Sequence, residues 1–389
     1  MSHCNTIFNQ LLGFLPRNEF NAFVGQHNAD KYVKKLNAWN QLIALLFAQA
    51  TGKDSLREIE LGLTLHASSW YHLGIKSVAR STLADANNRR SYQIFEKLFY
   101  NLVERCKEVT PQREFKFKNP LYSLDATTIQ LCLNVFDWAK YRTTKGAIKI
   151  HTVLNNKTTI PELINITVGN VADITNAQAI NLDCLEKESI IVFDRAFVDY
   201  EWWNKLDENE IFFVSRVKKN QNIFVLGQHN SKLNKGIITD EIVMFGAYDA
   251  INKYDKKLRR VKYYDEKKGK VYEYLTNNFK LSAHQIAMIY KDRWQIEIFF
   301  KWIKQNLKIK SFLGTSENAV MTQIWIAMIY YLLLSYIKFQ TKFEKSLLAL
   351  TRMIRETLMI RRDLIDLLSL NLHNLHKLKN KFNPQLAFF

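Results

Sequence analysis

LYSLDATTIQLCL, residues 121–133, is the stretch of the chain that decides the fold. Its apolar and threonine-rich composition is typical of a β-strand, and one acid, Asp125, interrupts it. An isolated carboxylate inside a strand is unfavourable unless a metal ion or a hydrogen-bonded cation matches its charge. Asp125 is therefore either a functional acid or an edge-strand acid that faces solvent.

Strand and helix patterns alternate after this stretch. We expect further strands at 148–154, 163–168, 190–193 and 211–217, and helices at about 173–185 and 200–206. Asn155, Asn156 and Pro161 are expected in the turn of the first hairpin. Three sequential strands followed by alternating helix and strand predict an α/β fold with a mixed sheet of the RNase H type.

A second acid, Asp194, directly follows the apolar run 190–193. It is a candidate functional acid at a strand end, and the alternative is a turn or helix cap. Among nearby residues, we expect Asp173 to be a helix cap and Asp199 to be a surface or capping acid. His151 is expected to be packed or hydrogen-bonded in the core rather than catalytic.

Residues 1 to about 110, before the strands, have helical patterns, with helices expected at 38–50 and 55–63. In the segment LGIKSVARSTLADANNRRSYQIF, residues 73–95, Gly74 marks a turn. Ser81 or Thr82 would cap a short polar helix that ends near Arg90. This pattern fits a helix-turn-helix that places the polar helix on DNA, and it fits equally an ordinary helical domain with a solvated face.

The composition favours a nucleic acid partner. The 389-residue chain contains 55 Lys and Arg against 37 Asp and Glu, a formal net charge of +18, and an anionic membrane surface ranks second as a partner. The four cysteines are far apart, which indicates neither a zinc site nor a disulfide framework and suits a cytoplasmic location. The apolar run 319–337 approaches membrane-span length, but we expect a buried core helix there.

Residues 218–278 are strongly basic. Over 216–280 there are 15 Lys and Arg against 7 Asp and Glu, and alternating Tyr, Val and charged residues suggest exposed antiparallel strands. We interpret Lys256, Lys257, Arg259 and Arg260 as a surface that follows DNA. The alternative is that these charges only keep the protein soluble.

A long helix is expected over about Ala283–Lys308, opened by a capping box of Ser282 and Gln285. At about 100° per residue, one narrow stripe of this helix holds a tyrosine, an acid and four cations: Tyr290, Arg293, Glu297, Lys301, Lys304 and Lys308. The apolar face holds Ile296, Phe299, Phe300, Ile303 and Leu307. A metal ligand flanked by phosphate-binding groups needs such a stripe, although a solvated face with ion pairs would also produce it.

These residues resemble a known family. Tyr290, Arg293, Glu297 and Lys304 form the pattern Y-x2-R-x3-E-x6-K, which resembles the YREK signature of DDE transposases of the insertion-sequence-four type. The surrounding sequence, YKDRWQIEIFFKWIKQNLKIKSFLG, is similar to that family over about 25 residues. LDATTIQL with KGAIKIHTVLN resembles the region of the first aspartate, and IIVFDRAF that of the second. The resemblance covers roughly residues 120–330.

The resemblance implies an RNase H-like core interrupted by a β-rich insertion before the helix of Glu297. It implies that Asp125, Asp194 and Glu297 bind one or two Mg²⁺ (or Mn²⁺) ions, most simply two per active site. Tyr290, Arg293 and Lys304 would contact terminal DNA phosphates. It also implies a homodimer that pairs two transposon ends and then engages target DNA.

The expected organisation has five parts. They are a helical DNA-binding region (1–112), a first part of the core (113–217), a basic insertion (218–280), a second part of the core with the YREK helix (281–340) and C-terminal helices (341–389). The C-terminal helices are expected to form either a subunit interface or intramolecular core. The expected function is that of a bacterial insertion-sequence transposase, cytoplasmic and nucleoid-associated when bound to DNA. The alternative is a catalytically inactive DNA-binding protein or repressor.

Overall fold

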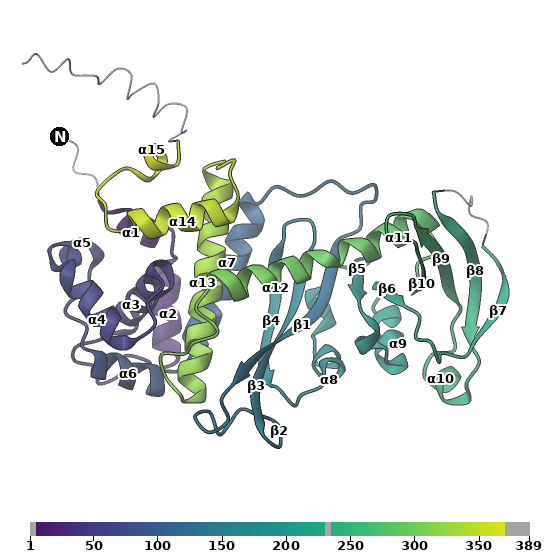
Figure 1. Cartoon of the computed structure of the whole chain (residues 1–389), viewed down its shortest axis with the longest axis horizontal. Coiled ribbons are helices and arrows are strands. Elements are labelled where there is room, and N and C mark those ends of the chain that lie inside the picture. Colours follow the sequence, from purple (N-terminus) through teal and green to yellow (C-terminus); the bar gives the residue numbers. More distant parts are fainter. Residues whose placement is uncertain (1–4, 230–234, 370–389) are drawn as a thin grey trace, which may run out of the picture. The chain divides into compact units, whose positions relative to one another are not determined.

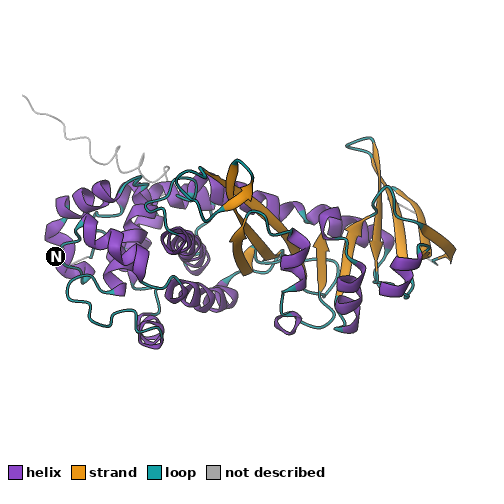
Figure 2. Cartoon of the chain, turned by 90° about the horizontal axis from the view of Figure 1, so that it is seen from below, coloured by secondary structure: helices purple, strands orange, loops and turns teal. Residues whose placement is uncertain are grey.

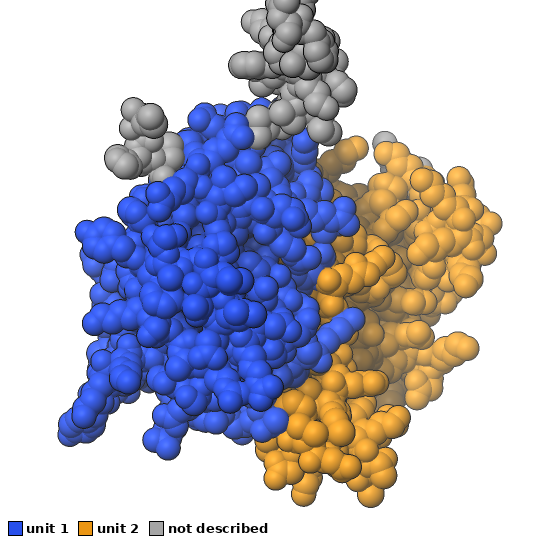
Figure 3. Space-filling view, turned by 60° about the vertical axis from the view of Figure 1, so that its left-hand side comes forward, with its two compact units in different colours: residues 1–110, 306–389 blue, residues 111–305 orange. Residues whose placement is uncertain are grey.

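The structure is a computed structural model that describes residues 5–229 and 235–369. The chain forms two compact units (Figure 3). Unit 1 combines Met1–Thr110 with Asn306–Phe389, and unit 2 is Pro111–Gln305. The described residues 341–369, expected as a separate C-terminal part, belong to the same unit as the N-terminal helices.

Within the described residues, all ten strands belong to one sheet in unit 2 (Figure 2). They are β1 (Leu121–Leu131), β2 (Lys140–Arg142), β3 (Lys145–Asn155), β4 (Ile160–Val168), β5 (Ile190–Phe193), β6 (Phe212–Arg216), β7 (Ile223–Gln228), β8 (Ile237–Phe245), β9 (Leu258–Asp265) and β10 (Lys270–Thr276). Their order is β2-β3-β1-β5-β6-β10-β9-β8-β7, with β4 pairing β3 (Figure 1). Strands β1, β3 and β4 pair antiparallel, and β5 and β6 run parallel to β1, which confirms the mixed α/β prediction.

Both faces of the central strands are buried, which explains their continuous apolar sequence. In β5, Ile191 and Phe193 pack into one hydrophobic cluster with Trp202 and Trp203 of α9 (Tyr200–Glu208). Residues 190 and 192 of the same strand pack into a second cluster, which includes residues of α11 (Ala283–Asp292). Successive residues of a strand point to opposite faces of the sheet. The cluster with α9 therefore covers one face of the sheet, and the cluster with α11 covers the other.

Three details differ from the expected strands and helices. Pro161 lies inside β4 opposite Leu154, at a register irregularity that tolerates its missing N–H, and not in the turn. The helix expected over 173–185 stops early, as α8 (Asp173–Gln178) and a 3₁₀ helix (Leu182–Cys184). Asp173 is the first residue of α8 rather than its cap, which is Ala172.

The basic segment after β6 is not separate from the core sheet. It contains β7, β8, α10 (Tyr248–Lys253), β9 and β10, and β10 pairs antiparallel with β6. The sheet therefore continues from the core strands into the inserted strands. Leu258 and Val261 of β9 are fully buried, so the expectation of exposed strands is wrong for this part.

The helix expected over 283–308 is interrupted at Arg293. Helix α11 ends at Asp292 and α12 (Trp294–Asn306) follows, with hydrogen bonds from Arg293 N to Tyr290 O (3.3 Å) and from Ile296 N to Arg293 O (3.1 Å). These bonds span three residues, which is a tighter turn than an α-helix makes. The predicted capping box of Ser282 and Gln285 is present. The predicted apolar face is confirmed, because all five of its residues are buried.

Unit 1 is helical within its described residues, apart from an isolated bridge between Thr6 and Arg361. Its helices are α1 (Ile7–Leu12), α2 (Arg17–Gln26), α3 (Ala38–Thr51), α4 (Leu56–Leu65), α5 (Trp70–Leu73), α6 (Arg80–Arg89), α7 (Gln93–Val109), α13 (Glu317–Gln340), α14 (Leu347–Thr357) and α15 (Leu364–Leu368). Helix α13 is long and apolar enough to cross a membrane, but 94% of its most apolar window is buried. It packs against α3, α6, α7 and α14, which confirms the expected core helix.

Two expectations in unit 1 need correction. Helix α6 begins at Arg80 after Ala79, and neither Ser81 nor Thr82 caps it. The guanidinium of Arg90, expected at the exposed end of this helix, is buried. Helix α14 packs on α13 and α3, which favours intramolecular core for this part of the C-terminal region. The part of the expected C-terminal helices after residue 369 lies outside the described residues.

Candidate active site

The sheet register places Asp125 and Asp194 side by side. Strands β1 and β5 are parallel neighbours in which Leu124 pairs with Phe193. Asp125 follows Leu124 within β1, and Asp194 directly follows Phe193, the last residue of β5. Adjacent strands lie about 4.8 Å apart. Leu124 and Phe193 both point into the cluster with α9, so the two acids emerge on the opposite face, where α11 lies.

The third acid, Glu297, comes from the first turn of α12. The guanidinium of Arg293 connects it to the sheet: Nη1 donates to Asp125 Oδ2 at 3.1 Å and Nη2 donates to Glu297 Oε1 at 2.5 Å. The two side chains are partly exposed, 22% for Asp125 and 33% for Glu297, so solvent and ligands reach them. Residues 172 positions apart in sequence are thereby brought to one site.

The surroundings of Asp125 disfavour its charged form. Burial raises the pKa of Asp125 to about 6, and the charges of Asp194 and Glu297 act in the same direction. A hydrogen bond from the backbone N–H of Ala126 and the charge of Arg293 oppose that rise in the pKa. A carboxylate whose charge is costly in the free protein gains most from a bound cation.

Asp194 also serves as a helix cap. Its Oδ1 accepts a hydrogen bond from Ala196 N at 2.7 Å and begins a 3₁₀ helix (Arg195–Phe197). The capping interpretation and the functional one are compatible, because a cap uses one carboxylate oxygen and fixes the direction of the other.

Carboxylate oxygens are the ligands that Mg²⁺ and Mn²⁺ prefer, so the donor set fits a hard divalent ion. Among the described residues, however, no three His, Cys, Asp or Glu side chains are grouped closely enough to hold one. Arg293 lies between two of the acids instead, and its buried Nε has no hydrogen-bond partner in the described part of the chain. Arg293 therefore occupies carboxylate oxygens of Asp125 and Glu297 that a bound cation would need.

The other residues of the predicted stripe differ in their placement. The ring of Tyr290 packs on that of Tyr274, with centroids 4.8 Å apart, and the guanidinium of Arg293 lies 5.8 Å from the Tyr290 ring centroid. Lys301 is exposed and Lys304 is half-buried on α12. Lys308 lies beyond the end of α12, in unit 1, where its Nζ pairs with Asp54 at 2.7 Å, so it does not extend the stripe.

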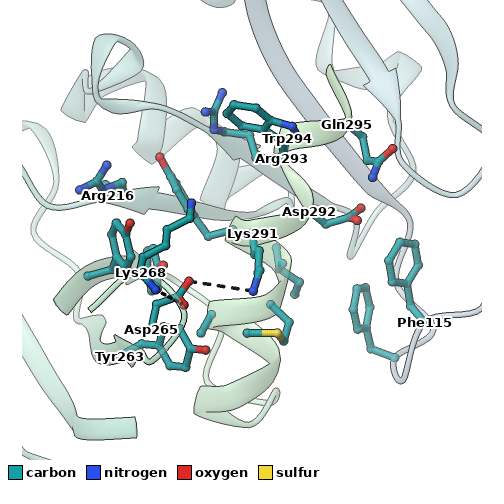
Figure 4. A pocket seen from close by; sticks show the side chains of 17 residues that line it. Phe115, Arg216, Tyr263, Asp265, Lys268, Lys291, Asp292, Arg293, Trp294 and Gln295 are labelled. Carbon is teal, nitrogen blue, oxygen red and sulfur yellow. Dashed lines mark hydrogen bonds and ion pairs between the residues drawn. The ribbon is translucent and has the colours of Figure 1, made fainter. Parts of the chain in front are cut away.

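A cavity of about 740 Å³ adjoins Arg293 in unit 2 (Figure 4). Aromatic and charged side chains line it, among them Phe115, Arg216, Tyr263, Lys268, Tyr272, Lys291 and Trp294. The guanidinium of Arg216 lies 4.9 Å from the Tyr272 ring centroid, and Lys291 pairs with Asp265 at 3.9 Å. Sequence reasoning missed these residues, and the alternation of Tyr and charge in residues 262–274 was an available signal for Tyr263 and Tyr272 alone.

The basic residues proposed for the insertion fall into two kinds. Lys256 and Lys257 are exposed, although Lys256 pairs with Asp207 at 2.9 Å. Arg259 is fully buried in a bidentate pair with Asp240, which is also fully buried, so the prediction that Arg259 lies on a DNA-facing surface is wrong. Arg260 is mostly buried against Glu241 at 2.6 Å.

The competing polar residues are structural. Asp199 caps α9 by accepting from Trp202 N at 2.8 Å, as expected. His151 is 2% exposed and its Nε2 lies 2.9 Å from Thr167 Oγ1, which confirms a hydrogen-bonded core histidine. Burial lowers the pKa of His151 to about 4.

Comparisons with known proteins agree with this geometry. Residues 116–333, more than half of the chain, match the family model of the transposase DDE domain. Residues 3–76 match a model described as a domain of unknown function (DUF4372).

Three curated relatives are named as transposases. One is y4zB of Sinorhizobium fredii, 35% identical over 293 residues, which are 74% of this chain and 80% of the relative. Another is the transposase for the insertion sequence element IS5377 of Geobacillus stearothermophilus, 29% identical over 69% of this chain and 70% of the relative. A third, for the element IS4SA of Synechocystis, is 26% identical over 67% of this chain and 72% of the relative. With the DDE domain model covering more than half of its length and a relative 35% identical over 74% of this chain, the chain belongs to the family of insertion-sequence transposases with a DDE domain.

Proposed function

We propose that this transposase uses Asp125, Asp194 and Glu297 as its catalytic acids. The observation that carries the proposal is the convergence of β1, β5 and α12, which brings one acid from each element to the same face of the sheet. The reaction proposed is cleavage of DNA at the terminal inverted repeats and joining of the freed 3′ ends to target DNA, a cut-and-paste pathway.

The family uses divalent metal ions. We propose Mg²⁺ or Mn²⁺, two per active site, held by the three carboxylates. When bound, such ions stabilise the entering and leaving oxygens of an in-line displacement at phosphorus. The chain's contribution is to hold the acids on rigid strands and on a helix start, and to move Arg293 away from Asp125 and Glu297 when they ligate.

A DNA phosphate is a second partner for Arg293, because a guanidinium binds phosphate in the same forked geometry in which it binds carboxylate. We propose that Tyr290, Arg293 and Lys304, with exposed Lys301 beside them, position the terminal phosphates of the transposon end. This is the role that the YREK resemblance implies. A DNA phosphate would draw Arg293 off the acids and so couple DNA binding to metal binding.

The remaining assignments concern the larger assembly. We propose that residues 1–112 bind the transposon ends, and that two copies of the chain pair those ends as a homodimer. The exposed cations Lys256 and Lys257 of the insertion are proposed as contacts to flanking DNA. The protein would act in the cytoplasm, on the nucleoid.

The test is cleavage of duplex DNA that carries the sequences flanking the reading frame. The proposed function predicts Mg²⁺-dependent nicking at the repeat boundary, strand transfer into a second duplex, and loss of both on chelation. Binding of the same duplex without any nicking in Mg²⁺ or Mn²⁺ would instead identify an inactive DNA-binding protein or repressor.

A further inference from the structure

A loop of unit 1 exposes cations beside α6. Residues 27–36 connect α2 to α3, and Lys31, Lys34 and Lys35 of this loop are all exposed. Tyr32 in the same loop is 89% exposed, and Lys31 Nζ lies 5.3 Å from its ring centroid. The ring and the three lysines are therefore all accessible to a partner at the same surface.

The loop backbone is strained at the same place. Tyr32 has a φ of 62° and Asn28 a φ of 48°, the left-handed region that residues other than glycine rarely adopt. For a bulky residue such as tyrosine this conformation is unfavourable, and it persists only where the surrounding structure imposes it. The Tyr32 ring is held at the surface, beside the ammonium group of Lys31.

The buried side chain of Arg90 imposes the loop conformation. Its Nε donates to Ala29 O at 3.0 Å and its Nη2 donates to Leu36 O at 2.7 Å, so it binds both ends of the lysine-bearing segment. It also pairs with Asp30 Oδ1 at 3.1 Å, and that oxygen accepts from Ala38 N at 2.8 Å. Because Arg90 directly follows α6, the loop and the helix are fixed to each other.

A groove of about 710 Å³ lies between the loop and α6. From α6 it is lined by Thr82, Asp85 and Arg89, which are three and four residues apart and share one helix face. The cations on the groove are Lys31, Lys34, Lys35 and Arg89. Two acids lie close to these cations. Asp85 pairs with Arg89 at 2.8 Å, and Asp30 pairs with the buried Arg90. The groove therefore carries a net positive charge on a loop whose backbone Arg90 holds in place.

We propose that loop 27–36 and α6 form a contact surface for duplex DNA. The three loop lysines neutralise phosphates of one backbone, and Tyr32 packs against the sugars between them. Contacts of this kind fix the position of a protein on a duplex without reading bases. The inference rests on the proposed role of residues 1–112 in end binding, and it names the surface that performs it. It also gives a function to the loop in the segment that matches a domain of unknown function.

The test compares charge-matched double variants of the full-length chain. Lys34→Ala/Lys35→Ala removes two groove cations, and Lys97→Ala/Lys345→Ala removes two exposed lysines elsewhere in unit 1. Binding to a short duplex of arbitrary sequence is measured over a range of salt concentrations. The groove variant should bind roughly tenfold more weakly, and its slope of log Kobs against log salt should fall by about 1.8, the value for two lost phosphate contacts. The control variant and Lys34→Arg/Lys35→Arg should keep the wild-type slope.

Tyr32→Gly tests the strained residue. Glycine adopts the left-handed conformation freely, so the variant should melt at or above the wild-type Tm and still bind duplex more weakly. An early-melting Tyr32→Gly would overturn the proposal, because the ring would then be a packing residue. An unchanged salt slope for the groove variant would also overturn it, and tighter binding of single strands at the groove would replace the duplex assignment. None of these three results would affect the nicking proposed for the acids. A chain that binds no duplex at all would instead refute the proposed function itself.

Discussion

Arg293 pairs with two of the three candidate acids, a contact that the helical stripe did not predict. The stripe placed Arg293 beside Glu297 on one helix face, and only the sheet register brings Asp125 to the same guanidinium. In the proposed function, a metal ion takes over the charge that the arginine neutralises in the free protein.

Replacing Arg293 should separate DNA positioning from metal binding. Arg293→Ala is expected to reduce stable pairing of the transposon ends and to slow cleavage, because a phosphate contact is lost. In DNA-free protein it should bind Mn²⁺ at least as tightly as wild type, measured by titration calorimetry, because the competing cation is gone. Lys301→Ala removes one positive charge from the same helix and is the matched control. Weaker Mn²⁺ binding by Arg293→Ala would show that the arginine supports the acids rather than competing for them.

His151 should make the stability of unit 2 depend on pH. Burial lowers the pKa of His151 to about 4, so between pH 7 and pH 5 the unfolded chain takes up a proton that the folded chain does not. The free energy of unfolding should therefore fall by about 2 kcal/mol over that range, relative to His151→Gln, in urea denaturation. The raised pKa of Asp125 makes the free energy of unfolding rise as the pH falls over this range. This contribution is the same in wild type and in His151→Gln, so it cancels in the comparison. Equal pH dependence in the two proteins would mean that His151 is protonated in the folded state.

At the scale of elements, the break between α11 and α12 matters because it lies at Arg293. The apolar side of α12 still faces the core: Phe299 is 4% exposed, and its neighbour Ile298 is 49% exposed. Phe299→Ala should lower the free energy of unfolding by about 3–5 kcal/mol, and Ile298→Ala by less than about 1 kcal/mol. Both variants should retain DNA binding when folded. The reverse order of stabilities would mean that the helix is rotated and would remove the physical support for Glu297.

Strand β9 carries a buried charge pair where the sequence suggested a DNA surface. Arg259→Ala leaves Asp240 charged and buried, and should cost about 3–5 kcal/mol of stability. Lys257→Ala, two residues away and exposed, should change stability by less than about 0.5 kcal/mol but reduce the salt dependence of DNA binding. Thermal melting and salt titration of the two variants distinguish these roles. A stable Arg259→Ala protein with weakened DNA binding would restore the surface interpretation.

Patterns that depend on neighbouring residues were predictable at this scale. The apolar run of β5, the capping box of α11 and the buried side of α12 follow from periodicity and local hydrogen bonding. The break at Arg293, the pairing of β10 with β6 and the burial of Arg259 depend on partners far apart in sequence. A basic residue in an alternating strand has the same local pattern whether its partner is a phosphate or Asp240.

At the scale of the whole molecule, the N- and C-terminal segments share one unit. Ile7 N donates to Ile360 O at 3.0 Å, and Phe8 N donates to Leu358 O at 2.8 Å. Helix α3, buried over most of its length, packs against α13 and α14 as well as α4, so residues 1–110 alone leave part of its apolar surface uncovered. Unit 2 has two hydrophobic clusters of its own.

These contacts predict how fragments behave. A fragment of residues 111–305 should fold and unfold cooperatively, and a fragment of residues 1–110 should not. Circular dichroism during thermal melting provides the measurement. Cooperative melting of the 1–110 fragment would mean that the N-terminal helices form an independent domain, as the sequence alone suggested.

The account of the whole enzyme depends on three acids acting together, and the most direct test is strand cleavage by single variants. Asp125→Asn, Asp194→Asn and Glu297→Gln keep the size of each side chain and remove the charge that a metal ion needs. Each variant should bind duplex ends as wild type does and lose Mg²⁺-dependent cleavage. Asp199→Asn, a capping acid of α9 replaced by an equally good cap, should cleave normally. Cleavage within about tenfold of wild type by any of the three would remove that acid from the site and contradict the account.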